Sequence, residues 1–279
     1  MLGFVSIQYI SENMKNRIVW PHNKKFAVCL THDVDRIRKT YQYITHIKKG
    51  NFSAMWQLLE GRNPYWNFKT IMEIEDKFGV RSTFFFLQES KKMDLVRPKE
   101  WVLSRGKYKF NDKKVKEVIQ LLDRNDWEIG LHGSYESYRN EDLLKNEKKE
   151  LEAILGSEIV GIRQHYLNLE IPKTWRIQQK VGFQYDASFG FRGKVGFRNG
   201  RYLPFHPFND SFLEIPLAIM DSPLFSNYDS EDAIWGECFS LIENVEDCNG
   251  ILSVLWHQRV FNEKEFPRWS KIYENIIKA

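Results

Sequence analysis

Seven short apolar runs alternate along this chain with stretches in which apolar residues recur at helical spacing. The runs are rich in β-branched and aromatic residues, and they lie at 26–30, 81–87, 128–132, 159–165, 184–188, 213–217 and 251–257. Such runs are typical of buried strands, and the amphipathic stretches between them predict helices. Strands that alternate with helices form a parallel sheet covered by helices, so the pattern predicts an α/β protein.

The 279 residues are enough for one α/β barrel, and no linker, repeat or low-complexity tract divides them. We therefore expect a single domain over residues 1–279, built as a closed or nearly closed barrel of seven strands. Its core would span about 24–261, after an N-terminal extension over 1–23 and before a C-terminal helix over about 265–279. An open doubly wound sheet is the alternative, but no glycine-rich phosphate loop follows the first strand.

The net charge and the cysteine content indicate which binding partners and which cellular compartment to expect. The net charge is +4, and basic residues alternate with acidic ones, which is typical of solvated helix faces and not of a nucleic-acid-binding surface. No apolar run approaches the length of a membrane span, and the N-terminus lacks a signal-peptide pattern. Three cysteines without metal or redox spacing indicate a reducing compartment, so we expect a cytoplasmic protein. The sequence gives no indication of oligomeric state.

The first predicted strand ends in Thr31-His32-Asp33-Val34-Asp35. If the chain stays extended, Asp33 and Asp35 point to one side, because side chains alternate along a strand. Two carboxylates so close repel each other, so they usually share a metal ion or divide acid and base roles. The alternative is a helix N-cap at one aspartate, with the other carboxylate solvated.

Other reactive side chains also lie at or just after the ends of predicted strands. They are His132 and Glu136 after the third, Arg163 and His165 in the fourth, Asp186 in the fifth, His257 in the seventh, and His206 between the fifth and sixth. In a β/α barrel the active site lies at the carboxyl ends of the strands. We therefore expect these side chains to surround one site.

The chemistry of these groups points to metal-assisted hydrolysis. Neutral histidine and ionised carboxylate are common ligands of Zn²⁺. His132 and Glu136 would share a face if a helical turn follows the third strand, and an aspartate of the first strand would complete a three-ligand site. A bound metal ion lowers the pKa of its water towards about 7 and polarises a carbonyl. A second carboxylate as base and a histidine as acid would complete the site, whereas no Gly-x-Ser-x-Gly elbow supports a covalent route.

Taken in order, these motifs resemble those of the polysaccharide deacetylase family, also called the NodB-homology family or carbohydrate esterase family 4. The resemblance covers about 24–261. The family's Thr-Phe-Asp-Asp-Gly motif is similar to 31–35, its His-Ser/Thr-x-x-His motif to 132–136 and its Arg-x-Pro stretch to 163–165. Its Leu-x-His motif is similar to 255–257, and its fourth motif contains an aspartate that resembles Asp186.

The resemblance implies a distorted (β/α)7 barrel that removes N- or O-acetyl groups from sugars with a divalent metal ion, for which we expect Zn²⁺. It implies that Asp33 is the general base and His257 the general acid. Arg163 and Asp186 would orient the base and the acid. His132 would be a metal ligand.

The chain departs from the family pattern at several positions. Val34 stands where the family has its metal-binding aspartate, so Asp35 is the expected substitute. Glu136 replaces the second histidine of the family, and His165 replaces a residue that is usually proline, so either is a candidate third ligand. His206 has no counterpart in the family motifs. The whole set resembles a divergent branch that is associated with surface-polysaccharide or O-antigen gene clusters.

We therefore expect a hydrolase that acts on a carbon–nitrogen bond, or on an acetyl ester, of a sugar or polysaccharide precursor. One alternative is a metal-independent hydrolase of amides or cyclic amides with the same fold, and metal analysis separates it from the first hypothesis. Another is a carbohydrate-binding protein whose catalytic site has decayed. The presence of Asp33, His132, Arg163 and His257 argues against decay.

Overall fold

The structure is a computed structural model that describes residues 3–4, 20, 23–40, 63–90, 107–208 and 210–279. Most of the expected N-terminal extension over 1–23 lies outside these residues. Within the described residues all named strands belong to one sheet, and every paired set of neighbours is parallel. Parallel pairing follows from the helices and loops that carry the chain back between successive strands.

All seven predicted strands are present. They are β2 (Ala27–Val34), β3 (Thr83–Leu87), β4 (Glu128–Gly133), β5 (Gly161–Gln164), β6 (Tyr185–Asp186), β7 (Leu213–Glu214) and β9 (Ile251–Leu255). Two strands that the apolar pattern did not predict, β1 (Gly3–Phe4) and β8 (Ile219–Met220), contain two residues each. β6 and β7 are equally short but lie inside the predicted runs, whereas β1 and β8 lie outside all of them.

The sheet order is β7-β6-β5-β4-β3-β2-β9-β8, and β1 pairs with β2. No pairing joins β7 to β8 in the described part of the chain, so the sheet curls into an open half-barrel and does not close. The predicted fold, an α/β protein with a distorted barrel of parallel strands, is confirmed.

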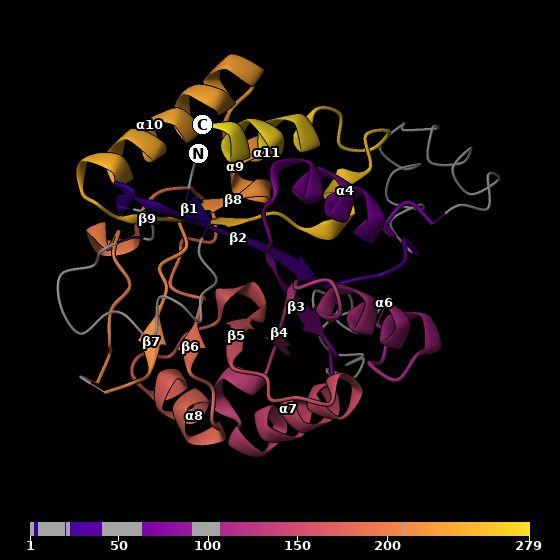
Figure 1. The fold of residues 1–279 in the computed structure, drawn as a ribbon. Coiled ribbons are helices and arrows are strands. Elements are labelled where there is room, and N and C mark those ends of the chain that lie inside the picture. Colours follow the sequence, from indigo (N-terminus) through magenta and orange to yellow (C-terminus); the bar gives the residue numbers. More distant parts are fainter. Residues whose placement is uncertain (1–2, 5–19, 21–22, 41–62, 91–106, 209) are drawn as a thin grey trace, which may run out of the picture.

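Helices cover the outer side of the curved sheet (Figure 1). They are α4 (Phe68–Phe78), α6 (Lys113–Asp123), α7 (Glu141–Leu155), α8 (Lys173–Val181), α9 (Asp221–Asn227), α10 (Glu231–Asp247) and α11 (Trp269–Lys278). α4, α7 and α8 end at Gly79, Gly156 and Gly182, each with left-handed backbone. Glycine adopts this conformation without steric cost, so it is well suited to end a helix.

Alternation along the strands assigns residues to the two faces of the sheet. In β2, Val28 and Leu30 belong to the large core cluster that includes the helices, whereas Ala27 and Cys29 belong to a separate cluster inside the curve. β9 shows the same alternation, with Leu252 and Val254 outside. Residues two positions apart therefore share a face, and this rule determines which side chains reach the interior at the strand ends.

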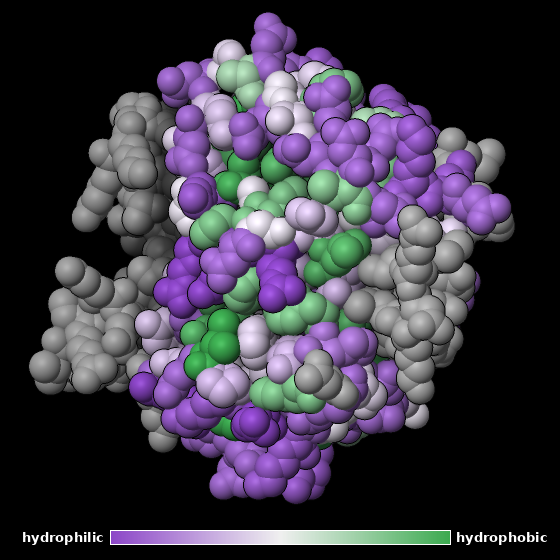
Figure 2. All heavy atoms as spheres, turned by 90° about the vertical axis from the view of Figure 1, so that its left-hand side faces the viewer, coloured by the Kyte–Doolittle hydropathy of each residue, from purple (hydrophilic) through white to green (hydrophobic). Residues whose placement is uncertain are grey.

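The face of the molecule in Figure 2 is mostly hydrophilic, and its hydrophobic side chains lie in separate patches surrounded by hydrophilic ones. Most large apolar side chains of the strands and helices are buried instead. In the residues that the structure describes, no helix is long and apolar enough to span a bilayer.

Candidate active site

A cavity of about 240 Å³ lies at the carboxyl ends of the central strands. Its lining residues are Asp33, Asp35, Arg36, His132, His165, Tyr166, Leu167, Arg192, Met220, Ser222, Leu255, His257 and Arg259. Five of the predicted site residues, from four different strand ends, are among them. They meet because parallel strands bring their carboxyl ends to one edge of the sheet, and alternation turns these side chains inward.

Asp33 is held in place by Arg163, which is fully buried on β5. Nη1 of Arg163 donates hydrogen bonds to Oδ1 of Asp33 at 3.0 Å and to Oγ1 of Thr31 at 2.7 Å. Its Nε donates to the carbonyl oxygen of Ala187 at 2.9 Å. The planar guanidinium thus fixes one oxygen of the Asp33 carboxylate. The other oxygen, Oδ2, lies 3.5 Å from Nε2 of His132.

One ring nitrogen of His132 faces the cavity, because the other forms a hydrogen bond with the backbone. Its Nδ1 lies 2.8 Å from the carbonyl oxygen of Arg163. A carbonyl accepts and does not donate, so Nδ1 carries the proton and Nε2 of the neutral ring has a free lone pair. Burial opposes protonation, but the carboxylates of Asp33 and Asp35 beside the ring outweigh it and raise the pKa of His132.

His165 is oriented in a similar way by Glu89, a residue that the sequence analysis did not select. Nδ1 of His165 lies 3.1 Å from Oε2 of Glu89, which also accepts a hydrogen bond from the backbone N–H of Tyr135 at 3.1 Å. A carboxylate on Nδ1 leaves Nε2 to face the cavity, as in many metal-binding histidines. Nε2 lies 3.9 Å from Oδ1 of Asp35. The signal that could have found Glu89 is its place two residues after β3.

The two oxygens of Asp35 differ, because Oδ2 is hydrogen-bonded to Arg259, whereas Oδ1 lies 3.3 Å from Nε2 of His132. Nη1 of Arg259 donates to Oδ2 at 2.6 Å. Oδ1 is buried and has no hydrogen-bond partner in the described part of the protein. Burial alone would raise the pKa of Asp35, but His257, His132 and Arg259 hold it well below its ordinary value. A buried carboxylate oxygen without a donor is costly, and a cation is the usual compensation.

Asp35, His132 and His165 fit a divalent metal ion. Each offers one ligand atom, and the three atoms lie within 4.8 Å of one another. Two imidazole nitrogens and one carboxylate oxygen are a typical ligand set of Zn²⁺ that leaves a position for water or substrate. The bonds on the far side of both imidazole rings keep their ligand nitrogens directed inward.

His257 is oriented by Asp221, the first residue of α9, and not by the predicted Asp186. Asp221 is fully buried, and its Oδ2 accepts the backbone N–H of His257 at 2.7 Å. Both of its oxygens lie 2.9 Å from Nδ1 of His257. Burial would raise the pKa of Asp221, but the charge of His257 outweighs it, so the pKa is lowered. Nε2 of His257 is left facing the cavity, 3.5 Å from Oδ2 of Asp35.

Asp186 lies outside the cavity lining and contacts neither catalytic candidate in the hydrogen bonds of the described residues. Its Oδ1 accepts hydrogen bonds from Nε2 of Gln178 at 3.1 Å and from Oγ of Ser188 at 2.6 Å. Burial raises its pKa although hydrogen bonds with Glu214, Ser188 and Trp175 and the charge of Arg163 oppose the shift. The surroundings of Asp186 are those of a buried carboxyl that joins α8 to β6.

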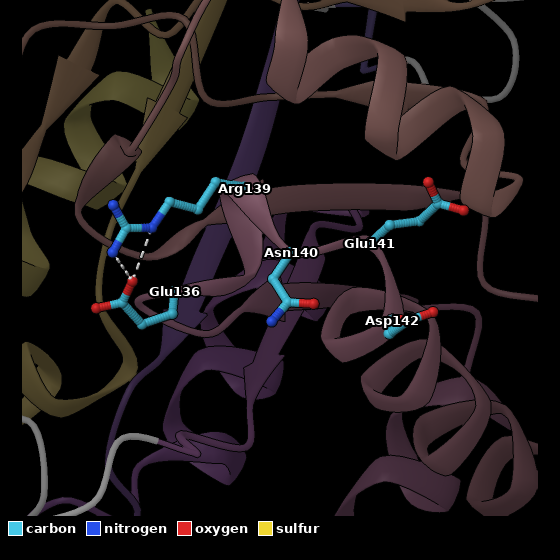
Figure 3. Close-up of a pocket in the computed structure, with 5 residues that line it drawn as sticks. All are labelled: Glu136, Arg139, Asn140, Glu141 and Asp142. Atoms are coloured by element: carbon cyan, nitrogen blue, oxygen red, sulfur yellow. Dashed lines mark hydrogen bonds and ion pairs between the residues drawn. The ribbon is translucent and has the colours of Figure 1, made fainter.

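Glu136 does not line this cavity either. After β4 the chain forms a 3-10 helix at Ser137–Arg139, so His132 and Glu136 do not share a helical face. Figure 3 shows Glu136 directed at Arg139, whose Nε donates to it at 2.9 Å, in a separate surface pocket. His206 is elsewhere, with Nδ1 2.9 Å from the carbonyl oxygen of Phe212. Of the candidate third ligands, the structure therefore places His165 with Asp35 and His132.

No protein-family model and no curated protein sequence matches this chain. Solved structures share its fold, among them the following three. A protein from Mycobacterium smegmatis that is assigned as a polysaccharide deacetylase is 17% identical, with a TM-score of 0.60 over 94% of this chain and 85% of that one. An allantoinase is 14% identical, with a TM-score of 0.61 over 96% and 89%. A protein from Pseudomonas aeruginosa that is also assigned as a polysaccharide deacetylase is 13% identical, with a TM-score of 0.60 over 96% and 90%. At these identities the comparison establishes the fold.

Proposed function

We propose that this protein is a metal-dependent hydrolase that removes an N-acetyl or O-acetyl group from a sugar or polysaccharide precursor. The observation that carries the proposal is the group formed by Asp35, His132 and His165 next to Asp33 and His257 in one cavity. The fold shared with two proteins assigned as polysaccharide deacetylases supports it. The motif resemblance extends the proposal to precursors of surface polysaccharides, and the sparse cysteine content extends it to action in the cytoplasm.

Asp35, His132 and His165 would hold the ion. When bound, it would polarise the acyl carbonyl and make water a better nucleophile at neutral pH. Nδ1 of His132 is bonded to the carbonyl oxygen of Arg163, and Nδ1 of His165 is bonded to Glu89. These hydrogen bonds keep the two rings in the orientation that metal binding requires.

Asp33 is the proposed general base. Its Oδ1 is occupied by Arg163, so Oδ2 is the atom that takes the proton of the attacking water. Arg163 keeps this carboxylate fixed throughout, since its three hydrogen bonds leave the guanidinium little freedom. The base and the metal ligand are thus two residues apart on one strand face, which separates their roles while keeping them adjacent.

His257 is the proposed general acid. Nδ1 is tied to Asp221, so Nε2 is the atom that gives a proton to the departing amine or alcohol. The buried carboxylate of Asp221 fixes the ring through Nδ1 and would stabilise the positive charge that the ring carries before transfer. Acid and base follow from adjacent strands, β9 and β2, which pair with each other in the sheet.

A second candidate is hydrolysis of a small cyclic amide, which is favoured by the likeness to an allantoinase over 96% of this chain. In this case Asp33 and Asp35 would act with His132 and His165 as hydrogen-bond donors and without a metal ion. Metal content of the purified protein, and the effect of a chelator on its activity, separate the two candidates.

The test of the proposed function is acetate release from N-acetylated and O-acetylated sugars by protein loaded with Zn²⁺. Asp33→Ala and His257→Ala should each lower the rate by about 100-fold or more, because each removes a proton-transfer group. Glu136→Gln is the matched control, since this carboxylate is bonded to Arg139 outside the cavity, and it should leave the rate unchanged. Unchanged acetate release in both alanine variants would refute the assigned roles.

A further inference from the structure

The cavity is richer in positive than in negative side chains. Its lining contains Arg36, Arg192 and Arg259 but only two carboxylates, those of Asp33 and Asp35. Both carboxylates already have a cationic partner, because Arg163 binds Asp33 and Arg259 binds Asp35. A divalent ion on Asp35, His132 and His165 would add two further positive charges. The space left for substrate is therefore cationic.

Arg192 is the lining cation with neutral partners only. Its Nη2 donates to Oδ1 of Asn168 at 2.8 Å and, more weakly, to the carbonyl oxygen of Leu167 at 3.5 Å. No carboxylate lies within ion-pair distance of Arg192 among the residues that the structure describes. Its charge is therefore not compensated by the described residues around it.

The acceptor that holds Arg192 is itself fixed. Nδ2 of Asn168 donates to the carbonyl oxygen of Tyr135 at 3.2 Å, so the Oδ1 of this amide must face Arg192. Asn168 is also largely buried, with 8% of its surface exposed. The loops after β4, β5 and β6 are thus joined through one amide, which holds the guanidinium at the cavity before any ligand arrives. Holding a binding group in position beforehand lowers the entropy cost of binding.

An uncompensated, pre-positioned guanidinium beside a cationic site matches an anionic group. Arginine binds carboxylate and phosphate oxygens through hydrogen bonds in which both partners are charged. By contrast, removal of an acetyl group from a neutral amino sugar produces an ammonium ion, which this cavity would repel. An anionic substituent on the same sugar would offset that repulsion and would attract the substrate.

We propose that Arg192 recognises an anionic substituent, a carboxylate or a phosphate, on the acetylated sugar that this site takes. The inference rests on the proposed function, because it names the substrate class of the same cavity. Arg192 is a specificity residue, and the chemistry of deacetylation remains with Asp33 and His257.

The test compares three ligands: the methyl glycoside of N-acetylglucosamine, the same sugar with a carboxylate at C6, and the same sugar with a phosphate at C6. Dissociation constants are measured by calorimetry in the His257→Ala background, which prevents turnover, and kcat/KM for acetate release is measured in the wild-type protein. We expect at least one anionic sugar to bind roughly tenfold or more tightly than the neutral sugar, as one charge-assisted hydrogen-bonded pair implies.

Arg192→Met should reduce this preference at least about fivefold, Arg192→Lys should retain part of it, and added salt should weaken it. Arg124→Met is the matched control, because Arg124 is an exposed arginine at the end of α6 outside the cavity, and it should leave the preference intact. Whether the carboxylate or the phosphate is preferred identifies the substituent.

Equal binding of neutral and anionic sugars, no detectable binding of any of them, or a preference that survives Arg192→Met would overturn the inference. Failure of the proposed function gives a different result. If no sugar releases acetate but the anion preference in binding still depends on Arg192, the inference stands and the deacetylase function is refuted.

Discussion

Asp221→Asn is the change that tests which aspartate orients His257. The sequence predicts that Asp186 does so, whereas in the structure Asp221 does. Asp221 accepts two hydrogen bonds from His257, from the backbone N–H at 2.7 Å and from Nδ1 at 2.9 Å. Asparagine has one oxygen, and its amide nitrogen cannot accept. Because both oxygens of Asp221 lie 2.9 Å from Nδ1, the amide nitrogen faces this donor in either orientation, and one contact to Nδ1 is lost.

The size of the effect follows from these contacts. Loss of a hydrogen bond to a charged carboxylate costs about 1.5–3 kcal/mol. The lost contact to Nδ1 stabilises the charged ring that gives up a proton in the transition state. At 1.36 kcal/mol for each factor of ten, the expected loss in kcat/KM is about 10- to 150-fold.

The assay is acetate release, with thermal unfolding measured in parallel. Asp186→Asn is the matched control, because Asp186 is equally buried but bonds to Gln178 and Ser188 instead of His257. We expect Asp186→Asn to lower stability and to change kcat/KM much less than Asp221→Asn. A large loss of rate in Asp186→Asn with a near-normal rate in Asp221→Asn would show that the reasoning from the structure is wrong.

Two further predictions concern carboxylates outside the ligand group. Glu89→Gln should weaken Zn²⁺ binding by about 10- to 100-fold in a chelator competition, because Glu89 orients His165, and unchanged affinity would contradict this. Burial raises the pKa of Glu147 to about 8, so its folded form binds a proton that the unfolded chain has already released. The stability that this gives is present in acid and is lost as pH rises through about 8, so urea midpoints of the wild type should fall between pH 5 and pH 9. Glu147→Gln should flatten that fall, and an unchanged slope would exclude Glu147 as its source.

The sequence predicts the part of the site that local periodicity determines. β2 remains extended through Val34, so Asp33 lies on the inner face and His32 on the outer face, where it contacts Glu75 of α4. The same alternation directs His132 and His257 inward. These positions follow from the period of the strand alone, which is why a single sequence was enough to find them.

The sequence misses the parts that depend on contacts between distant segments. Asp221 follows a strand of two residues, which leaves almost no periodic signal, and its partner is 36 positions away. Glu136 was selected on the assumption of an α-helical turn after β4, but the chain there forms a 3-10 helix. Asp186 has the residue type of an orienting group, yet its tertiary neighbours give it other partners. Residue type and spacing identify candidate residues, and tertiary contacts determine which of these residues lie in the site.

The central claim is that Asp35, His132 and His165 hold a divalent metal ion, with Asp33 left as the base. Anomalous diffraction from crystals grown with Zn²⁺ tests it most directly. We predict one strong peak that marks a zinc ion about 2.0–2.2 Å from Oδ1 of Asp35 and from Nε2 of both histidines. No peak in this cavity, or a peak that Asp33 or Glu136 ligates in place of Asp35, would contradict it.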